Sequence, residues 1–202
     1  MKPFSWFLFG VLVVLLCGGI AGFIFLRGVK GFSAREKPSS VEEWIARNAR
    51  SAAIPPDAKV RANPIPKSEE AIREARAHWA DHCAFCHANN GSGETQMGRN
   101  LYPPPPDLRG NATQQMRDGE LFYFIVNGIR LSGMPAWGSG HGEDDSWKLV
   151  HFIRHLPQLS SSEQKEMEKL NPKSPAELDK DDKKENVLRG NKSHEMKPTH
   201  HH

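Results

Sequence analysis

The feature that most constrains this chain is an uncharged run of 23 residues near the start of the sequence, from Phe4 to Leu26. A helix rises about 1.5 Å per residue, so the run is long enough to cross the roughly 30 Å hydrocarbon core of a bilayer. We expect residues 1–30 to be an uncleaved membrane anchor. A cleaved signal peptide competes, although its apolar core is typically about 7–15 residues. A lipidated Cys17 is a third interpretation, but Leu16 stands where a small residue is expected.

Charge is unevenly distributed along the 202 residues, which carry a formal net charge of +3. Residues 1–66 hold nine Lys or Arg against four Asp or Glu, whereas residues 67–157 hold nine against eleven. The basic excess therefore lies beside the apolar run and not on a compact domain. This distribution argues against a nucleic-acid partner.

Composition divides the rest of the chain into three parts. Ser39 or Ser40 can cap a short helix over residues 39–51, which we interpret as a stalk helix and, alternatively, as a partner-docking helix. Four prolines within residues 54–66 predict an extended spacer. We therefore assign residues 31–66 to a stalk and spacer, 67–159 to a compact domain and 160–202 to a charged tail. Within the tail, residues 162–170 extend a helix, and we expect disorder beyond it.

The motif with the most specific chemistry is Cys83-Ala84-Phe85-Cys86-His87. Two thiols one helical turn apart can each add to one vinyl group of the same porphyrin, and the following histidine can supply Nε2 to the iron. A thioredoxin-like redox site needs a βαβ context, which is absent, and a zinc site needs a second Cys/His pair. His78 and His82 precede the motif on the same helix. The motif therefore predicts one covalently attached haem c.

The segments around the motif read as helices. Ser68 can cap a helix whose apolar stripe, Ile72, Ala75 and Trp79, is typical of a core face and which runs into Cys83. A second helix is predicted from a cap at Asp118 to a stop at Asn127-Gly128.

Met134 is the expected second iron ligand. It lies between Gly133 and Pro135 in a loop that follows the second helix, so its thioether is free to turn toward iron. A loop methionine can also simply fill space. Met97 is the runner-up, and the remaining candidates are Met116, His141, His151 and His155. A methionine ligand favours ferrous iron relative to a second histidine.

The chain resembles a class I, monohaem cytochrome c of the membrane-anchored bacterial type. The residues that carry the resemblance are Cys83, Cys86, His87, the run 101–108, the stretch 127–137 ending in Met134-Pro135-Ala136-Trp137, and the amphipathic segment 147–154. The resemblance covers about half of the chain and implies an all-α fold. The first and third motifs are specific, while the last is only an amphipathic helix.

The resemblance also implies roles for further residues. A proline carbonyl accepts a hydrogen bond from the ligand histidine in that family; here the proline lies among residues 103–106, with Pro105 as the candidate taken forward. Leu108 is expected to pack on the haem, and Trp79 to meet the face of Val150 and Ile153. Trp137 and Trp147 either enclose the pocket or fill the core; we favour the core, and keep Trp137 as a candidate haem contact.

Other histidines offer a second metal chemistry. His151 and His155 are four residues apart and could chelate a metal, but exposed polar positions on a helix are the simpler interpretation. The end of the chain, with His194, Met196 and residues 200–202, could bind copper or nickel, and is equally explained by a purification tag or by chance.

These expectations combine into a single-pass protein of the bacterial inner membrane with its haem domain in the periplasm. Arg27, Lys30, Arg35 and Lys37 follow the apolar run, so a literal positive-inside count places the domain in the cytoplasm. We override it, because haem attachment requires export and the rule is weak for long domains.

The expected role is that of an electron carrier and not an enzyme, because two protein ligands leave iron no open position. Its expected partners are the bilayer, a redox donor and an acceptor, such as a membrane respiratory or dehydrogenase complex. The alternatives are a dedicated subunit of a larger dehydrogenase or oxidase complex, a haem-based sensor with a labile ligand, and metal delivery by the tail.

Overall fold

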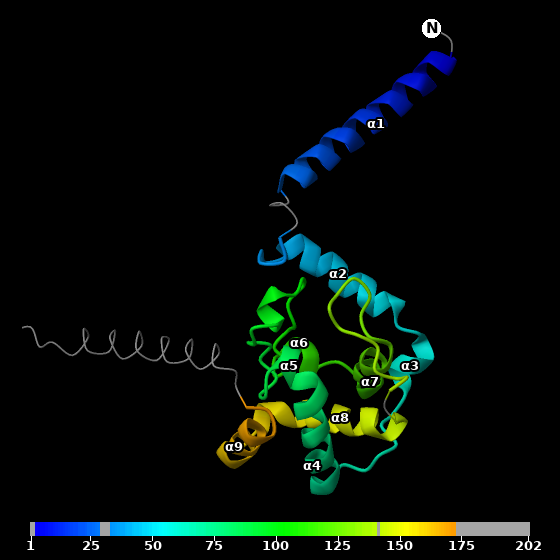
Figure 1. Cartoon of the computed structure of the whole chain (residues 1–202). Helices are drawn as coiled ribbons and strands as arrows, with labels where there is room; N and C mark the ends of the chain where they lie inside the picture. The colour runs from blue at the N-terminus through cyan, green and yellow to red at the C-terminus, as the bar shows by residue number, and fades with distance from the viewer. Residues whose placement is uncertain (1–2, 29–32, 141, 173–202) are drawn as a thin grey trace, which may run out of the picture. The chain divides into compact units, whose positions relative to one another are not determined.

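The computed structural model describes residues 3–28, 33–140 and 142–172, and these residues form helices and connecting segments without a strand (Figure 1). The predicted all-α class is confirmed. The chain divides into two compact units, one from Met1 to Glu36 and one from Lys37 onward, which are described separately. Residues 194–202, with the histidines for which we considered metal binding, lie outside the described residues.

The first unit is the helix α1, Pro3–Gly28. Phe4–Arg27 is long and apolar enough to cross a membrane, by length and composition alone. An N-terminal signal sequence has the same properties. The helix therefore agrees with the predicted span in extent, and its role as an anchor belongs to the function proposed below.

The second unit begins with α2, Ser40–Ala53, and α3, Pro56–Val60. Ser39 and Glu42 form a capping box at the start of α2, so the helix predicted over residues 39–51 is confirmed to within two residues. By contrast, α3 lies inside the segment predicted to be extended. Pro56 occupies the first helical turn, where its missing N–H has no intrahelical partner to lose.

The residues after α3 are packed and not a free spacer. The Asn63 side chain donates a hydrogen bond to the carbonyl of Trp147 at 3.0 Å. His151 Nε2 donates to the carbonyl of Ile65 at 2.7 Å, and Ile54, just before α3, is also buried. The packed domain therefore begins before the boundary predicted at residue 67.

The core forms where α4, Glu69–His78, crosses α8, Glu143–His155 (Figure 1). Ser68 caps α4 as predicted, since its hydroxyl accepts a hydrogen bond from the Ala71 N–H. A π-helical turn η1, Trp79–Cys83, and a short helix α5, Ala84–His87, continue α4. Trp79 is buried with its ring 5.4 Å from that of Phe152 on α8, so α4 and its continuation pack on α8. The contact is with Phe152, and the expected contact with the face of Val150 and Ile153 stays a prediction.

The helix α7, Asp118–Asn127, packs on α8 and on α3. The predicted cap was Asp118, but the observed cap is Arg117, so the helix begins one residue earlier. The backbone N–H of Arg117 donates to the Glu120 carboxylate at 2.8 Å. It ends at Gly128, whose φ of +65° suits glycine, as predicted. Trp147 of α8 is fully buried and stacks on Phe122 at 3.9 Å between ring centres.

The last described helix, α9 (Ser161–Leu170), matches the helix predicted over residues 162–170, but it packs on the domain, beyond the boundary predicted at residue 159. Its side chain Met167 is fully buried, and Arg76 of α4 pairs with Glu163 at 3.4 Å and with Glu166. The small number of apolar residues in the tail did not predict this packing, because one buried methionine and a cluster of ion pairs hold the ten-residue helix on the domain. The remaining short elements are η2 (Gly98–Asn100), α6 (Asn111–Gln114), η3 (Leu156–Gln158) and α9 itself (Ser161–Leu170).

Candidate functional site

The two cysteines of the motif lie one helical turn apart, Cys83 at the end of η1 and Cys86 within α5. Both are free thiols. Burial, followed by the charge of Cys86, raises the pKa of Cys83 to about 12. Burial also raises the pKa of Cys86. Both groups are therefore neutral S–H groups at physiological pH and not reactive thiolates.

His87 is the last residue of α5, and its ring lies against Trp79 with 5.8 Å between ring centres. Its Nδ1 atom is buried and has no hydrogen-bond partner. Burial lowers the pKa of His87 to about 4, so the imidazole is neutral and keeps a lone pair for a metal. A buried, neutral imidazole next to two free thiols fits the donor set that haem c needs.

A tight loop after α5 holds the backbone of the motif. The Gly93 N–H donates to the carbonyl of His87 at 2.9 Å, and the Thr95 hydroxyl donates to that of Cys86 at 3.3 Å. A methyl group on Gly98 would lie 2.6 Å from the same Cys86 carbonyl oxygen, so only glycine fits there. The loop thus satisfies carbonyls that the end of a helix leaves unpaired.

Thr95 is a residue that the sequence reasoning missed. It is buried, and its hydroxyl also accepts a hydrogen bond from the Gly98 N–H at 2.8 Å. A threonine three residues before a glycine in a turn-rich segment is the signal that could have found it.

The proline-rich run lies against this loop. A methyl group on Gly93, which has a φ of +74°, would lie 2.6 Å from the carbonyl oxygen of Pro105. The Leu108 N–H donates to the carbonyl of Gly91 at 2.8 Å, and the Leu108 side chain packs on the core. The structure therefore brings Pro105 and Leu108 next to the loop that follows the motif. The expected hydrogen bond from His87 Nδ1 to a proline carbonyl is not formed.

The loop that carries Met134 is tied down at both ends. The Ile129 N–H donates to the Met134 carbonyl at 3.1 Å, and the Trp137 N–H donates to that of Ile125 at 3.1 Å. Gly133 lies against Leu101, since a methyl group on this glycine would be 2.7 Å from a Leu101 methyl carbon. Met134 is half-buried.

Trp137 connects this loop to the helix of the motif. Its ring lies 5.5 Å from the ring of His82, which immediately precedes Cys83. Trp137 is half-buried at the edge of the core, whereas Trp147 is inside the core. The loop of Met134 therefore contacts the motif helix through Trp137 and the proline-rich run through Leu101. Ligation of iron by Met134 remains a prediction.

The competing ligand candidates have other environments. Met97 is exposed, and Met116 packs on the core. His151 is buried and bonded to Ile65, which corrects the expectation of an exposed helix residue, and His155 pairs with Glu163 at 2.8 Å. His141 lies outside the described residues. The described part of the chain has no group of three or more His, Cys, Asp or Glu side chains placed to hold a metal.

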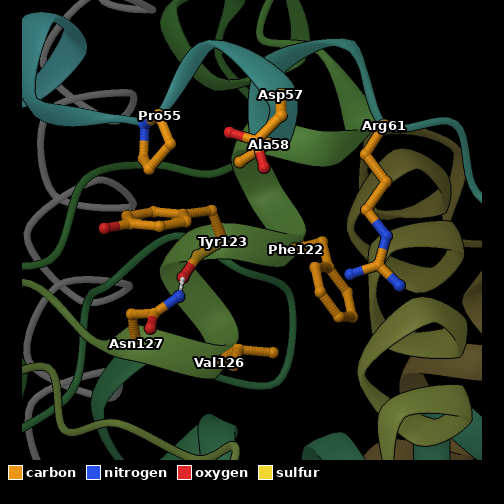
Figure 2. A pocket seen from close by; sticks show the side chains of 8 residues that line it. All are labelled: Pro55, Asp57, Ala58, Arg61, Phe122, Tyr123, Val126 and Asn127. Atoms are coloured by element: carbon orange, nitrogen blue, oxygen red, sulfur yellow. Dashed lines mark hydrogen bonds between the residues drawn. The ribbon is translucent and has the colours of Figure 1, made fainter.

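A surface cavity of about 250 Å³ lies between α3 and α7, away from the motif (Figure 2). The Arg61 guanidinium flanks it over the ring of Phe122, 4.8 Å from the ring centre. None of the predicted site residues lines this cavity. Its lining consists of Pro55, Asp57, Ala58, Arg61, Phe122, Tyr123, Val126 and Asn127.

The helical fold and the motif support a class I, monohaem cytochrome c domain within this chain. Residues 70–153 match the family model described as cytochrome C oxidase, cbb3-type, subunit III. The matched segment begins in α4, includes the motif and Met134, and ends in α8. A domain of this class implies haem binding and electron transfer.

The fold was also compared with solved structures. The chain aligns with a chain of the Kuenenia stuttgartiensis reducing HAO-like protein complex Kustc0457/Kustc0458 at 18% sequence identity and a TM-score of 0.42. The alignment covers 46% of this chain and 46% of that chain, so this protein spans less than half of its length.

Proposed function

We propose that this protein is a membrane-tethered c-type cytochrome that passes single electrons between a redox donor and an acceptor at the periplasmic face of the bacterial inner membrane. One haem is attached through Cys83 and Cys86, with His87 and Met134 as iron ligands. The observation that carries the proposal is the buried, neutral His87 beside two free thiols one helical turn apart.

The thiols are suited to attachment. Cys83 and Cys86 would hold the haem, since each S–H would add across one vinyl double bond, with the sulfur on one carbon and the hydrogen on the other, and such an addition needs no oxidant. Because Cys83 and Cys86 are on one helical segment, two thioether bonds fix the cofactor relative to His87. Bound haem would supply the Fe(III)/Fe(II) couple, while the protein excludes water and sets the potential.

The two ligands have separate supports. Trp79 packs against the His87 ring and donates its indole N–H to the carbonyl of Ala88 at 3.1 Å, which limits ring rotation. The loop hydrogen bonds of Ile129 and Trp137 hold the backbone around Met134. With both ligands in place, no iron position is left for a substrate, which supports a carrier over an enzyme.

The tether follows from α1 and the chain after it. An anchored domain stays in a thin layer above the membrane, which raises its effective concentration for membrane-bound partners. Export of the domain is required for haem attachment. The four basic residues after the span oppose this orientation by the charge rule, but that rule applies to short loops and the domain that follows is long.

The proposal is tested by the optical spectrum of the purified full chain, oxidised and reduced, with and without CO. We expect a near-infrared charge-transfer band in the oxidised form and no change with CO. Met134→Ala removes the band and allows CO to bind. Met97→Ala is the matched control and leaves both properties unchanged. CO binding by the unaltered protein would refute ligation by Met134 and favour the haem-based sensor.

Attachment needs its own measurement. Denaturing electrophoresis and the intact mass are expected to show one haem per chain, and Cys86→Ala is expected to lower the retained haem. A chain that loses all haem on denaturation would contradict covalent attachment while leaving haem binding itself in place.

A second candidate is a dedicated cytochrome subunit of a larger complex. The description of the matching family names a subunit of an oxidase, which favours this candidate. Extraction in mild detergent distinguishes the two: a stable co-purifying complex supports the subunit, and an isolated chain supports the shuttle.

A further inference from the structure

The stalk helix α2 carries an apolar stripe that nothing in its own domain covers. Val41, Trp44 and Ile45 are spaced three and four residues apart, which places them on one face of the helix. They are 65%, 65% and 54% exposed. Single exposed apolar residues are ordinary, but a stripe with a tryptophan marks an interaction surface.

The opposite side of α2 holds the domain. The Tyr102 hydroxyl donates to the Glu42 carboxylate at 3.1 Å, and the Arg50 guanidinium lies over the Phe124 ring, 5.8 Å from its centre. At about 100° per residue, Glu42 and Arg50 fall on one side of the helix, and Trp44 falls on the other. Val41 also lies well away from Arg50, whereas Ile45 is only about 60° from Glu42 around the helix. The centre of the stripe, formed by Trp44 and Val41, therefore faces away from the domain, and Ile45 lies at its edge.

The chain before α2 restricts what can cover this stripe. Residues 29–39 join α1 to α2, and roughly eleven residues extend at most about 40 Å. If α1 spans a bilayer, α2 cannot leave the surface of that bilayer by more than this distance. The neighbouring sequence is basic, with Arg27, Lys30, Arg35 and Lys37 against Glu36, and so complements anionic headgroups.

We propose that the apolar stripe of α2 lies in the headgroup region of the bilayer that α1 crosses. A tryptophan and aliphatic residues on one face, with charged residues on the other, are the composition of helices that lie in this region. The inference rests on the proposed anchoring by α1. It gives the protein a second membrane contact, which limits the orientation of the domain as well as its distance from the membrane.

The segment of Leu101 and Tyr102 lies between α2 and the loop of Met134, so a membrane contact at α2 would orient the proposed haem site relative to the bilayer. Tyr102, bonded to Glu42, follows Leu101, which packs on Gly133 beside Met134. A membrane-bound α2 therefore turns this side of the domain toward the lipid surface, where membrane redox partners are.

The test uses the full chain with a nitroxide label at one introduced cysteine, in a Cys17→Ser background. The probe is a nanodisc of phosphatidylcholine and phosphatidylglycerol in equal parts, with one chain per disc. Ile45→Cys places the label in the stripe. Arg47→Cys is the matched control, since its side chain is 61% exposed and lies on another face of α2. Electron paramagnetic resonance measures collisions with a water-soluble nickel complex.

We expect the label at position 45 to collide with nickel at least about threefold less often than the label at position 47. Equal collision rates at the two positions would overturn the proposal. Adding Val41→Ser and Trp44→Ser to Ile45→Cys is expected to raise the rate to that of the control. Protection that persists in this variant, or that appears only with several chains per disc, would point to a protein contact and overturn the membrane assignment.

The same samples separate failure of the proposed function from failure of this inference. A chain that leaves the disc refutes the anchor, and the inference with it. Label uptake in the background without an introduced cysteine shows that Cys83 and Cys86 are free, which refutes haem attachment and not membrane contact by α2.

Discussion

The two sides of the candidate haem site are supported in different ways. Around His87, the supporting residues come from one stretch of chain, with Trp79 before the motif and Gly93, Thr95 and Gly98 after it. Around Met134, the support comes from Leu101 and from the carbonyl of Ile125, and through Trp137 from the motif helix. A short sequence motif can therefore predict the surroundings of His87, whereas the surroundings of Met134 depend on contacts between distant parts of the chain.

The largest expected effect comes from breaking the histidine side at Gly98. A methyl group there would lie 2.5 Å from the Gly93 carbonyl oxygen and 2.6 Å from that of Cys86, and neither backbone atom can move freely. We expect Gly98→Ala to lower the free energy of unfolding by about 2–3 kcal/mol. Urea denaturation of the full chain measures it.

Gly140→Ala is the control for this variant, because its nearest non-neighbouring atom would be 3.9 Å away. It is expected to change stability by less than about 0.5 kcal/mol. Equal effects at the two glycines would contradict the tight loop around the motif.

A smaller loss of stability is expected at acid pH on the histidine side of the site, where protonation of Glu163 weakens the packing of α9 on α4. Burial opposes ionisation of Glu163, but hydrogen bonds from Ser160 and the contact with His155 outweigh it and lower its pKa to about 2. Because the pKa of Glu163 is lower in the folded protein than the ordinary value of 4.5, ionised Glu163 stabilises the fold above pH 4.5, and this contribution is lost as pH falls from 4.5 toward 2. We expect a loss on the order of 2 kcal/mol.

Denaturation of the full chain at a series of pH values, with and without Glu163→Gln, isolates this contribution. The variant is expected to be less stable at neutral pH and to lose less stability in acid. An unchanged acid dependence in the variant would show that Glu163, with its partners Arg76 and His155, does not hold α9 on α4.

The smallest effect on stability is expected at Gly133, on the methionine side. A methyl group there would meet the end of the Leu101 side chain at 2.7 Å, and that side chain can move. We expect Gly133→Ala to cost less than about 1 kcal/mol of stability while shifting the loop of Met134. The readout is CO binding to the reduced protein, which is expected to rise. If Gly133→Ala left CO binding unchanged and caused a large loss of stability, the Met134 loop would be as tightly packed as the loop around His87, which contradicts the comparison.

Sequence reasoning succeeded where the relevant interactions are local. The cap at Ser68 and the stop at Gly128 each depend on residues within a few positions of one another. The motif from Cys83 to His87 is equally local, and its binding of haem stays a prediction. The burial of His151 and of Met167 could not be read in the same way. Their environments are made by Ile65 and by the helices α4 and α8, many residues away in the sequence.

The hydrogen bonds between Asn89 and Asn171 have a consequence for the order of events during maturation. They join residues 82 positions apart, at 2.8 and 3.1 Å, and α9 also contacts η1, the turn that ends at Cys83. Closing so long a loop costs chain entropy, so we expect this contact to form after the local turns around the motif. If the chain is exported as proposed, it would pass through a stage in which the two thiols are already one helical turn apart and α9 has not yet packed, and haem could be attached during this interval.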